Sequence, residues 1–81
     1  MERCNVLVTG GARGIGAGIV EALAKEGHNV AFCGRAESES CAAFLAKLKA
    51  EYPGKFAYYR CDVSSAADRE KMLDAFEADF G

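Results

Sequence analysis

The sequence predicts an α/β fold in which three parallel strands alternate with three helices, β-α-β-α-β-α. Two observations carry this prediction. Three short apolar runs recur along the chain, and each is too short to form a helix. A longer segment with helical spacing of its apolar residues follows each run. Strands that alternate with helices over short connections form a parallel sheet with right-handed crossovers.

The predicted strands cover residues 4–10, 29–34 and 55–63. The first reads CNVLVTG, is rich in β-branched residues, and ends at a glycine. The second reads NVAFCG and the third KFAYYRCDV. Near-continuous apolar runs of this length are typical of parallel strands that are buried on both faces.

The first predicted helix begins within a glycine-rich segment. Ile15, Ile19 and Leu23 recur at four-residue spacing, with Val20 beside them, and we expect these residues to form the buried side. Gly27 ends the helix.

The second predicted helix covers residues 38–52. Its apolar stripe comprises Cys41, Phe44, Leu45, Leu48 and Tyr52. Glu37 and Glu39 stand at its start, where a negative charge is favoured by the helix dipole, and Pro53-Gly54 follows its end.

A third helix is predicted to follow the third strand, with Ser64 or Ser65 as its N-cap. Its expected apolar side comprises Met72, Leu73, Phe76 and Phe80. We expect the first two helices to share one face of the sheet and the third to cover the other. This arrangement is half of a doubly wound, Rossmann-type nucleotide fold, and we expect residues 1–81 to form one truncated domain.

Composition excludes several classes of protein. The 81 residues are 51% hydrophobic and 27% charged, which is typical of a globular domain. A net charge of -2 and a pI near 5.3 argue against a general surface for nucleic acid or anionic membrane. No apolar run is long enough to span a bilayer, and we expect a cytoplasmic protein.

Neither the cysteines nor the histidine are spaced like metal ligands. The four cysteines form no C-x-x-C pair, so we expect no metal site and interpret them as small hydrophobes. Cys33 and Cys61 both end predicted strands, which leaves a redox role as the alternative. The single histidine, His28, is interpreted as a solvated turn residue between helix and strand.

The segment VTGGARGIGAGI, residues 8–19, lies between the first strand and the first helix. At such a junction the free backbone N–H groups and the positive end of the helix dipole favour an anion. Glycine lets a phosphate approach the backbone because no Cβ is in the way. The segment therefore predicts a phosphate site.

The spacing of the glycines excludes two familiar phosphate loops. The P-loop pattern fails because Ala17-Gly18, and not Lys-Ser/Thr, follows Gly16. The strict G-x-G-x-x-G pattern is also absent. The pattern that remains is T-G-x-x-x-G-x-G, formed by Thr9, Gly10, Gly14 and Gly16.

This loop resembles the cofactor loop of the short-chain dehydrogenase/reductase family, and TGGARGIG is especially similar to its 3-oxoacyl-[acyl-carrier-protein] reductase branch. Asp62-Val63, after the third strand, is similar to the family's Asp-Val step, whose aspartate meets the adenine amino group. The resemblance implies a dinucleotide cofactor, and it implies that the three strands lie in the sheet in the order 3-2-1. The residues implied to bind it are Thr9, Gly10, Gly11, Ala12, Arg13, Gly14, Ile15, Gly16, Gly34, Arg35, Asp62 and Val63.

The residues at the end of the second strand predict which dinucleotide binds. Gly34-Arg35 stands where NAD-preferring sites place a carboxylate for the ribose 2′-OH. A guanidinium there can hold a 2′-phosphate, and Arg13 in the loop adds a second cation, so we expect NADP(H) in preference to NAD(H). The alternatives are that Arg13 is a solvated loop residue and Arg35 a surface charge at the helix entry.

The family's catalytic Y-x-x-x-K step is not found, since no lysine stands four residues after Tyr52, Tyr58 or Tyr59. We therefore expect no catalytic residue in residues 1–81. The resemblance implies the N-terminal cofactor-binding part of an NADP(H)-dependent oxidoreductase that reduces a carbonyl, such as a 3-oxoacyl thioester, and whose parent is a homo-oligomer. The alternatives are a free-standing dinucleotide-binding module and a non-functional truncated product.

Overall fold

The computed structural model describes residues 4–10 and 14–81. Three strands and three helices alternate along the chain, as the sequence predicts. They are β1 (Asn5–Thr9), α1 (Gly14–Lys25), β2 (Asn29–Gly34), α2 (Ser38–Glu51), β3 (Phe56–Arg60) and α3 (Ala66–Phe80). Each strand is shorter than or equal to its predicted range, because the ends of the apolar runs continue into turns.

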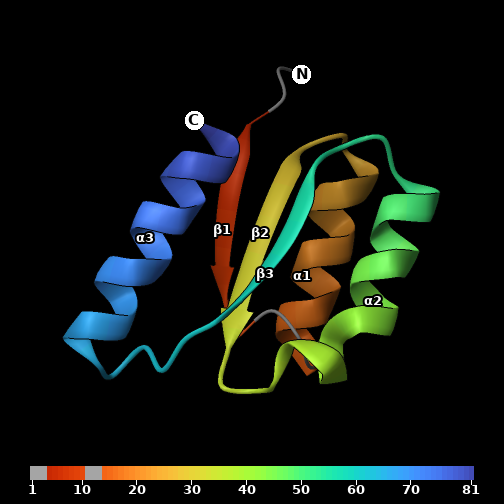
Figure 1. The fold of residues 1–81 in the computed structure, drawn as a ribbon. Helices are drawn as coiled ribbons and strands as arrows, with labels where there is room; N and C mark the ends of the chain where they lie inside the picture. The colour runs from red at the N-terminus through yellow and green to blue at the C-terminus, as the bar shows by residue number, and fades with distance from the viewer. Residues whose placement is uncertain (1–3, 11–13) are drawn as a thin grey trace.

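The strands form one parallel sheet with β2 in the middle, which confirms the predicted order. Val30 of β2 pairs with Val6 of β1 on one side and with Phe56 of β3 on the other. Because all three strands run in the same direction, their carboxyl ends meet at one edge of the sheet. Figure 1 shows that α1 and α2 cover one face of the sheet and α3 the other, as expected.

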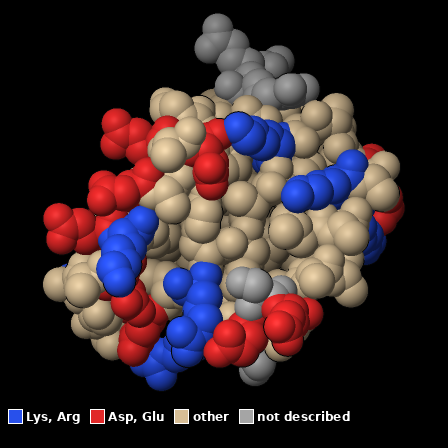
Figure 2. Space-filling model, viewed as in Figure 1, with Lys and Arg blue, Asp and Glu red and all other residues tan. Residues whose placement is uncertain are grey.

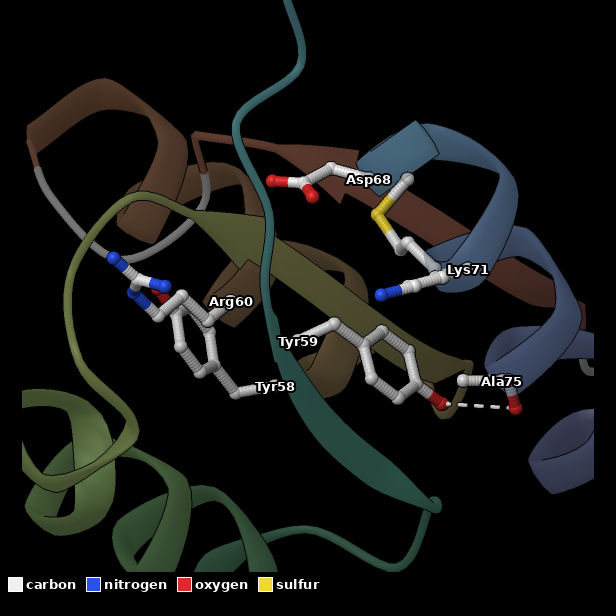
Figure 3. Close-up of a pocket in the computed structure, with 7 residues that line it drawn as sticks. Tyr58, Tyr59, Arg60, Asp68, Lys71 and Ala75 are labelled. Atoms are coloured by element: carbon white, nitrogen blue, oxygen red, sulfur yellow. Dashed lines mark hydrogen bonds between the residues drawn. The ribbon is translucent and has the colours of Figure 1, made fainter. Parts of the chain in front are cut away.

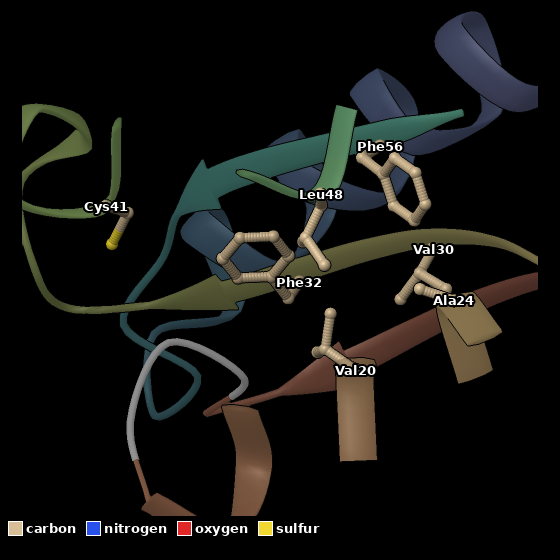
Figure 4. Close-up of a cluster of buried hydrophobic side chains, with 7 residues drawn as sticks. All are labelled: Val20, Ala24, Val30, Phe32, Cys41, Leu48 and Phe56. Carbon is tan, nitrogen blue, oxygen red and sulfur yellow. The ribbon is translucent and has the colours of Figure 1, made fainter. Parts of the chain in front are cut away.

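The main hydrophobic core lies between the sheet and the pair α1 and α2 (Figure 4). Its buried members are Val20, Ala24, Val30, Phe32, Cys41, Leu48 and Phe56. Phe32 is fully buried, and its ring contacts Phe44 of α2 with the centroids 5.5 Å apart. Burying an aromatic side chain of this size contributes about 1.5–3 kcal/mol to folding. The middle strand, β2, therefore lies at the centre of the core on the face covered by α1 and α2.

A smaller buried cluster lies under α3. Cys33, Cys61 and Met72 form it, with Leu7 and Tyr59 packed against it. Burial raises the pKa of the Cys33 thiol, which favours its neutral form. Both cysteines are buried and pack as small apolar groups, as predicted, and a redox role for them stays the alternative.

Two apolar sides predicted from spacing are partly wrong. In α1 the buried residues are Val20 and Ala24, whereas Ile15 and Ile19 are exposed. A strict four-residue spacing drifts away from the 3.6-residue turn, so residues chosen by that spacing leave the buried face. In α3 Met72 is buried but Leu73 is exposed, because a single row of residues faces the sheet there.

His28 is buried, so its interpretation as a solvated turn residue is wrong. Its Nδ1 accepts a hydrogen bond from the Cys4 backbone N–H at 3.0 Å, which ties the start of β1 to the α1–β2 turn. Beside it, a Cβ on Gly54 would lie 2.4 Å from the His28 carbonyl oxygen. The α2–β3 turn passes so close to this carbonyl that only glycine fits.

The N-cap of α3 is Ser65, whose hydroxyl accepts a hydrogen bond from the Asp68 N–H at 3.3 Å. Ser64 instead donates to the side chain of Asp62. Of the two serines left open by the sequence, Ser65 is therefore the cap, and Ser64 belongs to the turn that precedes it.

Candidate dinucleotide site

The candidate site lies at the carboxyl edge of the sheet, where the strand ends are held together by backbone hydrogen bonds. The Gly10 N–H donates to the Cys33 carbonyl at 2.7 Å, which joins the end of β1 to the end of β2. The Cys61 N–H donates to the Gly34 carbonyl at 2.8 Å, which joins β2 to β3. Three strand ends thus form one continuous rim. Ligands of open parallel sheets bind at this edge.

The glycine-rich segment begins at this rim. Thr9 is the last residue of β1, and Gly10 follows it with a φ of +70°, a conformation that glycine adopts without strain. Gly14, Ile15 and Gly16 form the first turn of α1. Gly11, Ala12 and Arg13 lie outside the described residues, so the place of the predicted Arg13 cation stays a prediction.

The predicted site residues after β2 and β3 face one another across the rim. Nη2 of the Arg35 guanidinium lies 3.2 Å from Oδ1 of Asp62. The Arg35 side chain is 76% exposed and that of Asp62 is 40% exposed. Val63 follows Asp62 and is also exposed. The structure therefore brings Gly34, Arg35, Asp62 and Val63 together at adjacent strand ends.

Asp62 is held in one orientation by its own turn. Its Oδ1 accepts hydrogen bonds from the Ser64 N–H at 3.0 Å and the Ser64 hydroxyl at 2.6 Å. These bonds, with a smaller contribution from Arg35, lower the pKa of the Asp62 carboxyl below its ordinary value. The Asp62 backbone N–H donates in turn to Asp68 Oδ2 at 3.1 Å. Asp62 is therefore a fixed, ionised acceptor.

Four charged side chains line a cavity of about 140 Å³ between the ends of β2 and β3: Arg35, Arg60, Asp62 and Asp68. Arg60, the last residue of β3, forms an ion pair with Glu37, with Nε 3.2 Å from Oε1. A second cavity, of about 260 Å³, adjoins it between β3 and α3 and shares Arg60 and Asp68 (Figure 3).

Two residues that form an ion pair at the site were not predicted from the sequence. In the sequence, Arg60 is only a polar residue at the end of a strand. Its pairing with Gly34 in the sheet places it beside the site. Glu37 was expected to act on the helix dipole. It occupies the N-cap of α2, but its side chain makes no capping bond and pairs with Arg60 instead. No local sequence signal indicates such a contact between segments that are far apart in the chain.

The rim also exposes apolar side chains. Ile15, in the first turn of α1, is 85% exposed, and Val63 is 46% exposed. Figure 2 shows acidic side chains gathered along the side that α3 occupies, with basic and acidic groups interspersed elsewhere on this face.

Comparison with known proteins decides the family. Residues 4–81 match the short chain dehydrogenase family. The chain belongs to this family.

Relatives of the chain in the short-chain dehydrogenase family include D-beta-hydroxybutyrate dehydrogenase of Cupriavidus necator. The two are 37% identical over 75 residues, which are 93% of this chain and 28% of that enzyme. The alcohol dehydrogenase of the archaeon Thermococcus sibiricus, solved in complex with 5-hydroxy-NADP, is similar with a TM-score of 0.91 and 30% identity. The comparison covers 99% of this chain and 34% of that one.

A third similar protein is the NADH-dependent reductase A1-R′, solved in complex with NAD. Its TM-score is 0.85 and its identity 29%, over 98% of this chain and 32% of that one. The chain thus spans about a third of the length of these relatives. One of these two solved proteins is in complex with 5-hydroxy-NADP and the other with NAD, so the preference between the two dinucleotides must be argued from the site.

The described residues of this short-chain dehydrogenase chain fit a dinucleotide at the rim. A helix N-terminus follows a glycine with positive φ, and a cation and an ionised acceptor stand at the adjacent strand ends. Among the described residues, no group of three or more His, Cys, Asp or Glu side chains is placed to hold a metal ion. None of the described helices combines the length and the apolar character that crossing a bilayer requires.

Proposed function

We propose that this chain binds NADP(H) in preference to NAD(H), as the cofactor-binding part of an oxidoreductase that reduces a carbonyl group. The bound cofactor supplies the hydride. The chain's own residues bind and orient its adenosine half. The glycine segment and the start of α1 receive the diphosphate, while Asp62 and Val63 contact the adenine. Arg35 receives the 2′-phosphate.

The observation that carries the preference is the exposed Arg35 guanidinium directly after β2. This position takes a carboxylate in NAD-preferring sites, because the carboxylate binds the ribose 2′-OH and repels a phosphate. Arginine presents a planar set of donors that matches a phosphate in bidentate fashion. Its only described ion-pair partner is Asp62. Ion pairs between exposed side chains contribute little to stability, so a phosphate can replace this one at small cost.

Glu37 is an acid two residues beyond Arg35 and could in principle serve as the ribose carboxylate. Its carboxylate is paired with Arg60 at 3.2 Å. An acid that is neutralised by a neighbouring arginine repels a 2′-phosphate less than a lone carboxylate does. This pairing supports the proposal that the cation at Arg35 sets the preference.

A second candidate function is a dinucleotide-binding module without catalysis. The two functions share the cofactor site and differ in whether the protein turns over a carbonyl substrate. We also propose a cytoplasmic location and, for the parent enzyme, a homo-oligomer.

Calorimetric titration of the purified protein with NADPH and NADH at one ionic strength tests the proposal. We expect NADPH to bind at least tenfold more tightly, because one charge-assisted pair with the 2′-phosphate contributes on the order of 1.5–3 kcal/mol. Equal affinities contradict the preference. Failure to bind either cofactor contradicts the dinucleotide site as a whole.

A further inference from the structure

The connection between β2 and α2, residues 35–37, carries Arg35 and is held by a side chain from β3. The Tyr58 hydroxyl lies 3.0 Å from the carbonyl oxygen of Gly34 and 2.6 Å from that of Ala36. These two carbonyls belong to the residues immediately before and after Arg35. A phenolic hydroxyl has a single hydrogen, so it is shared between the two acceptors. One hydroxyl thus fixes the backbone on both sides of the arginine.

Packing fixes the position of this hydroxyl. The Tyr58 ring is partly buried and contacts Phe32, with the centroids 5.2 Å apart. Phe32 is fully buried in the middle strand. Burial, and secondarily the neighbouring Cys41 thiol, raise the pKa of Tyr58 to about 12. The hydroxyl therefore keeps its proton, and remains a donor to the two carbonyls, throughout the neutral range.

The other described contacts of this connection are the packing of Ala36 against the main core, a hydrogen bond from the Ser40 N–H to the Glu37 carbonyl at 2.9 Å, and two ion pairs. Glu37 makes no capping bond to α2 and pairs with Arg60, an ion pair between two exposed side chains. Such a pair orders a loop weakly. The partly buried Tyr58 hydrogen bonds are thus the stronger of the two links from β3 to the connection.

We propose that Tyr58 is a positioning residue for Arg35 and that its hydroxyl sets how strongly the protein prefers a dinucleotide with a 2′-phosphate. The inference rests on the proposed function, because it assigns the 2′-phosphate to Arg35. Tyr58 does not touch the phosphate. Tyr58 holds the backbone that carries the Arg35 guanidinium to the phosphate. A charge-assisted hydrogen bond of fixed geometry weakens when the backbone that carries its donor moves.

The adjacent residue supplies a matched control. Tyr59 leaves β3 on the opposite side from Tyr58 (Figure 3). Its hydroxyl lies 2.7 Å from Asp79 Oδ2 and 3.5 Å from the Ala75 carbonyl, both on α3. Tyr59→Phe therefore removes the same atom from the same strand, while it leaves the connection at residues 35–37 untouched.

The test compares full-length Tyr58→Phe and Tyr59→Phe with the unsubstituted protein by hydrogen exchange without cofactor and by titration with NADPH and NADH. For Tyr58→Phe we expect faster exchange of the amides of residues 35–37 and about fivefold weaker NADPH binding. NADH affinity should change less than twofold. For Tyr59→Phe we expect neither change, although its stability falls.

Three results overturn the inference: a Tyr58→Phe variant that keeps its NADPH preference, one that loses NADPH and NADH affinity equally, or a Tyr59→Phe variant with the same loss of preference. The last two indicate a general effect on folding and not positioning of Arg35. An unsubstituted protein without an NADPH preference contradicts the proposed function before any variant is made. A preference that survives in Tyr58→Phe contradicts the inference alone.

Discussion

The guanidinium of Arg35 and the carboxylate of Asp62 lie 3.2 Å apart and join the carboxyl ends of β2 and β3. Both residues were predicted to lie at the cofactor site, but the contact between them was not predicted. Both side chains line the 140 Å³ cavity at the rim. Because both groups are solvent-exposed, the pair is weak and the Arg35 guanidinium can leave it for a ligand.

Replacing Asp62 with asparagine should sharpen the preference between the cofactors. Asp62→Asn removes the negative charge that partly neutralises Arg35, so we expect the NADPH to NADH affinity ratio to rise about twofold. Titration of both cofactors measures the ratio, with Asp74→Asn on the exposed side of α3 as the control of equal charge change. An affinity ratio that falls in Asp62→Asn, or that rises equally in the control, contradicts the prediction that the Asp62 charge partly neutralises Arg35.

The contribution of Asp62 to stability should change with pH only in the acid range. Its pKa is lowered, mainly by the two Ser64 hydrogen bonds, so the ionised form is favoured in the folded state. Its contribution is then complete above the unfolded-state pKa, about 3.9, and is lost as the pH falls through the lower folded value. Urea unfolding of the wild type and Asp62→Asn should show a stability difference near neutral pH that shrinks below about pH 4. A difference that shrinks between about pH 5 and 8 contradicts the assignment.

Two glycines should respond to alanine in opposite directions. At Gly54 the new Cβ would meet the His28 carbonyl oxygen at 2.4 Å, so we expect Gly54→Ala to destabilise the fold by about 2 kcal/mol. At Gly18, inside α1, nothing lies within 4 Å, and alanine should stabilise the helix by about 0.5–1 kcal/mol. Urea unfolding of the two variants measures both. If Gly54→Ala unfolds at the wild-type urea concentration, the close approach is wrong.

The fold could be predicted because its signals are local. Apolar runs and helical spacing locate β2 at the predicted residues and place the other elements within a few residues of their observed ends. The buried side of α1 was misjudged because four-residue spacing and a 3.6-residue turn agree over only one or two turns. The burial of His28 depends on a hydrogen bond to Cys4, which is distant in sequence.

The candidate site was predicted only in part, for a related reason. Glycine spacing and the Asp62-Val63 step are short motifs, so they can be read from the chain directly. The Arg60–Glu37 pair and the Tyr58 hydrogen bonds join segments more than 20 residues apart. They depend on the register of β2 with β3, which no local pattern specifies.

The variant Arg35→Asp tests whether Arg35 recognises the 2′-phosphate. The substitution removes a charge-assisted pair and adds a repulsive carboxylate, which should cost about 2 kcal/mol toward NADPH, or roughly thirtyfold in affinity. NADH affinity should hold or rise, because an aspartate there can bind the ribose 2′-OH. Lys49→Asp in the last turn of α2 makes the same change in net charge away from the rim and serves as the control.

Calorimetric titration of NADPH and NADH into the wild type, Arg35→Asp and Lys49→Asp, at one ionic strength, is therefore the deciding measurement. We predict that the NADPH to NADH affinity ratio falls about thirtyfold in Arg35→Asp and is unchanged in Lys49→Asp. A ratio in Arg35→Asp equal to that of the wild type would show that Arg35 is only a surface charge at the entry of α2 and does not recognise the 2′-phosphate.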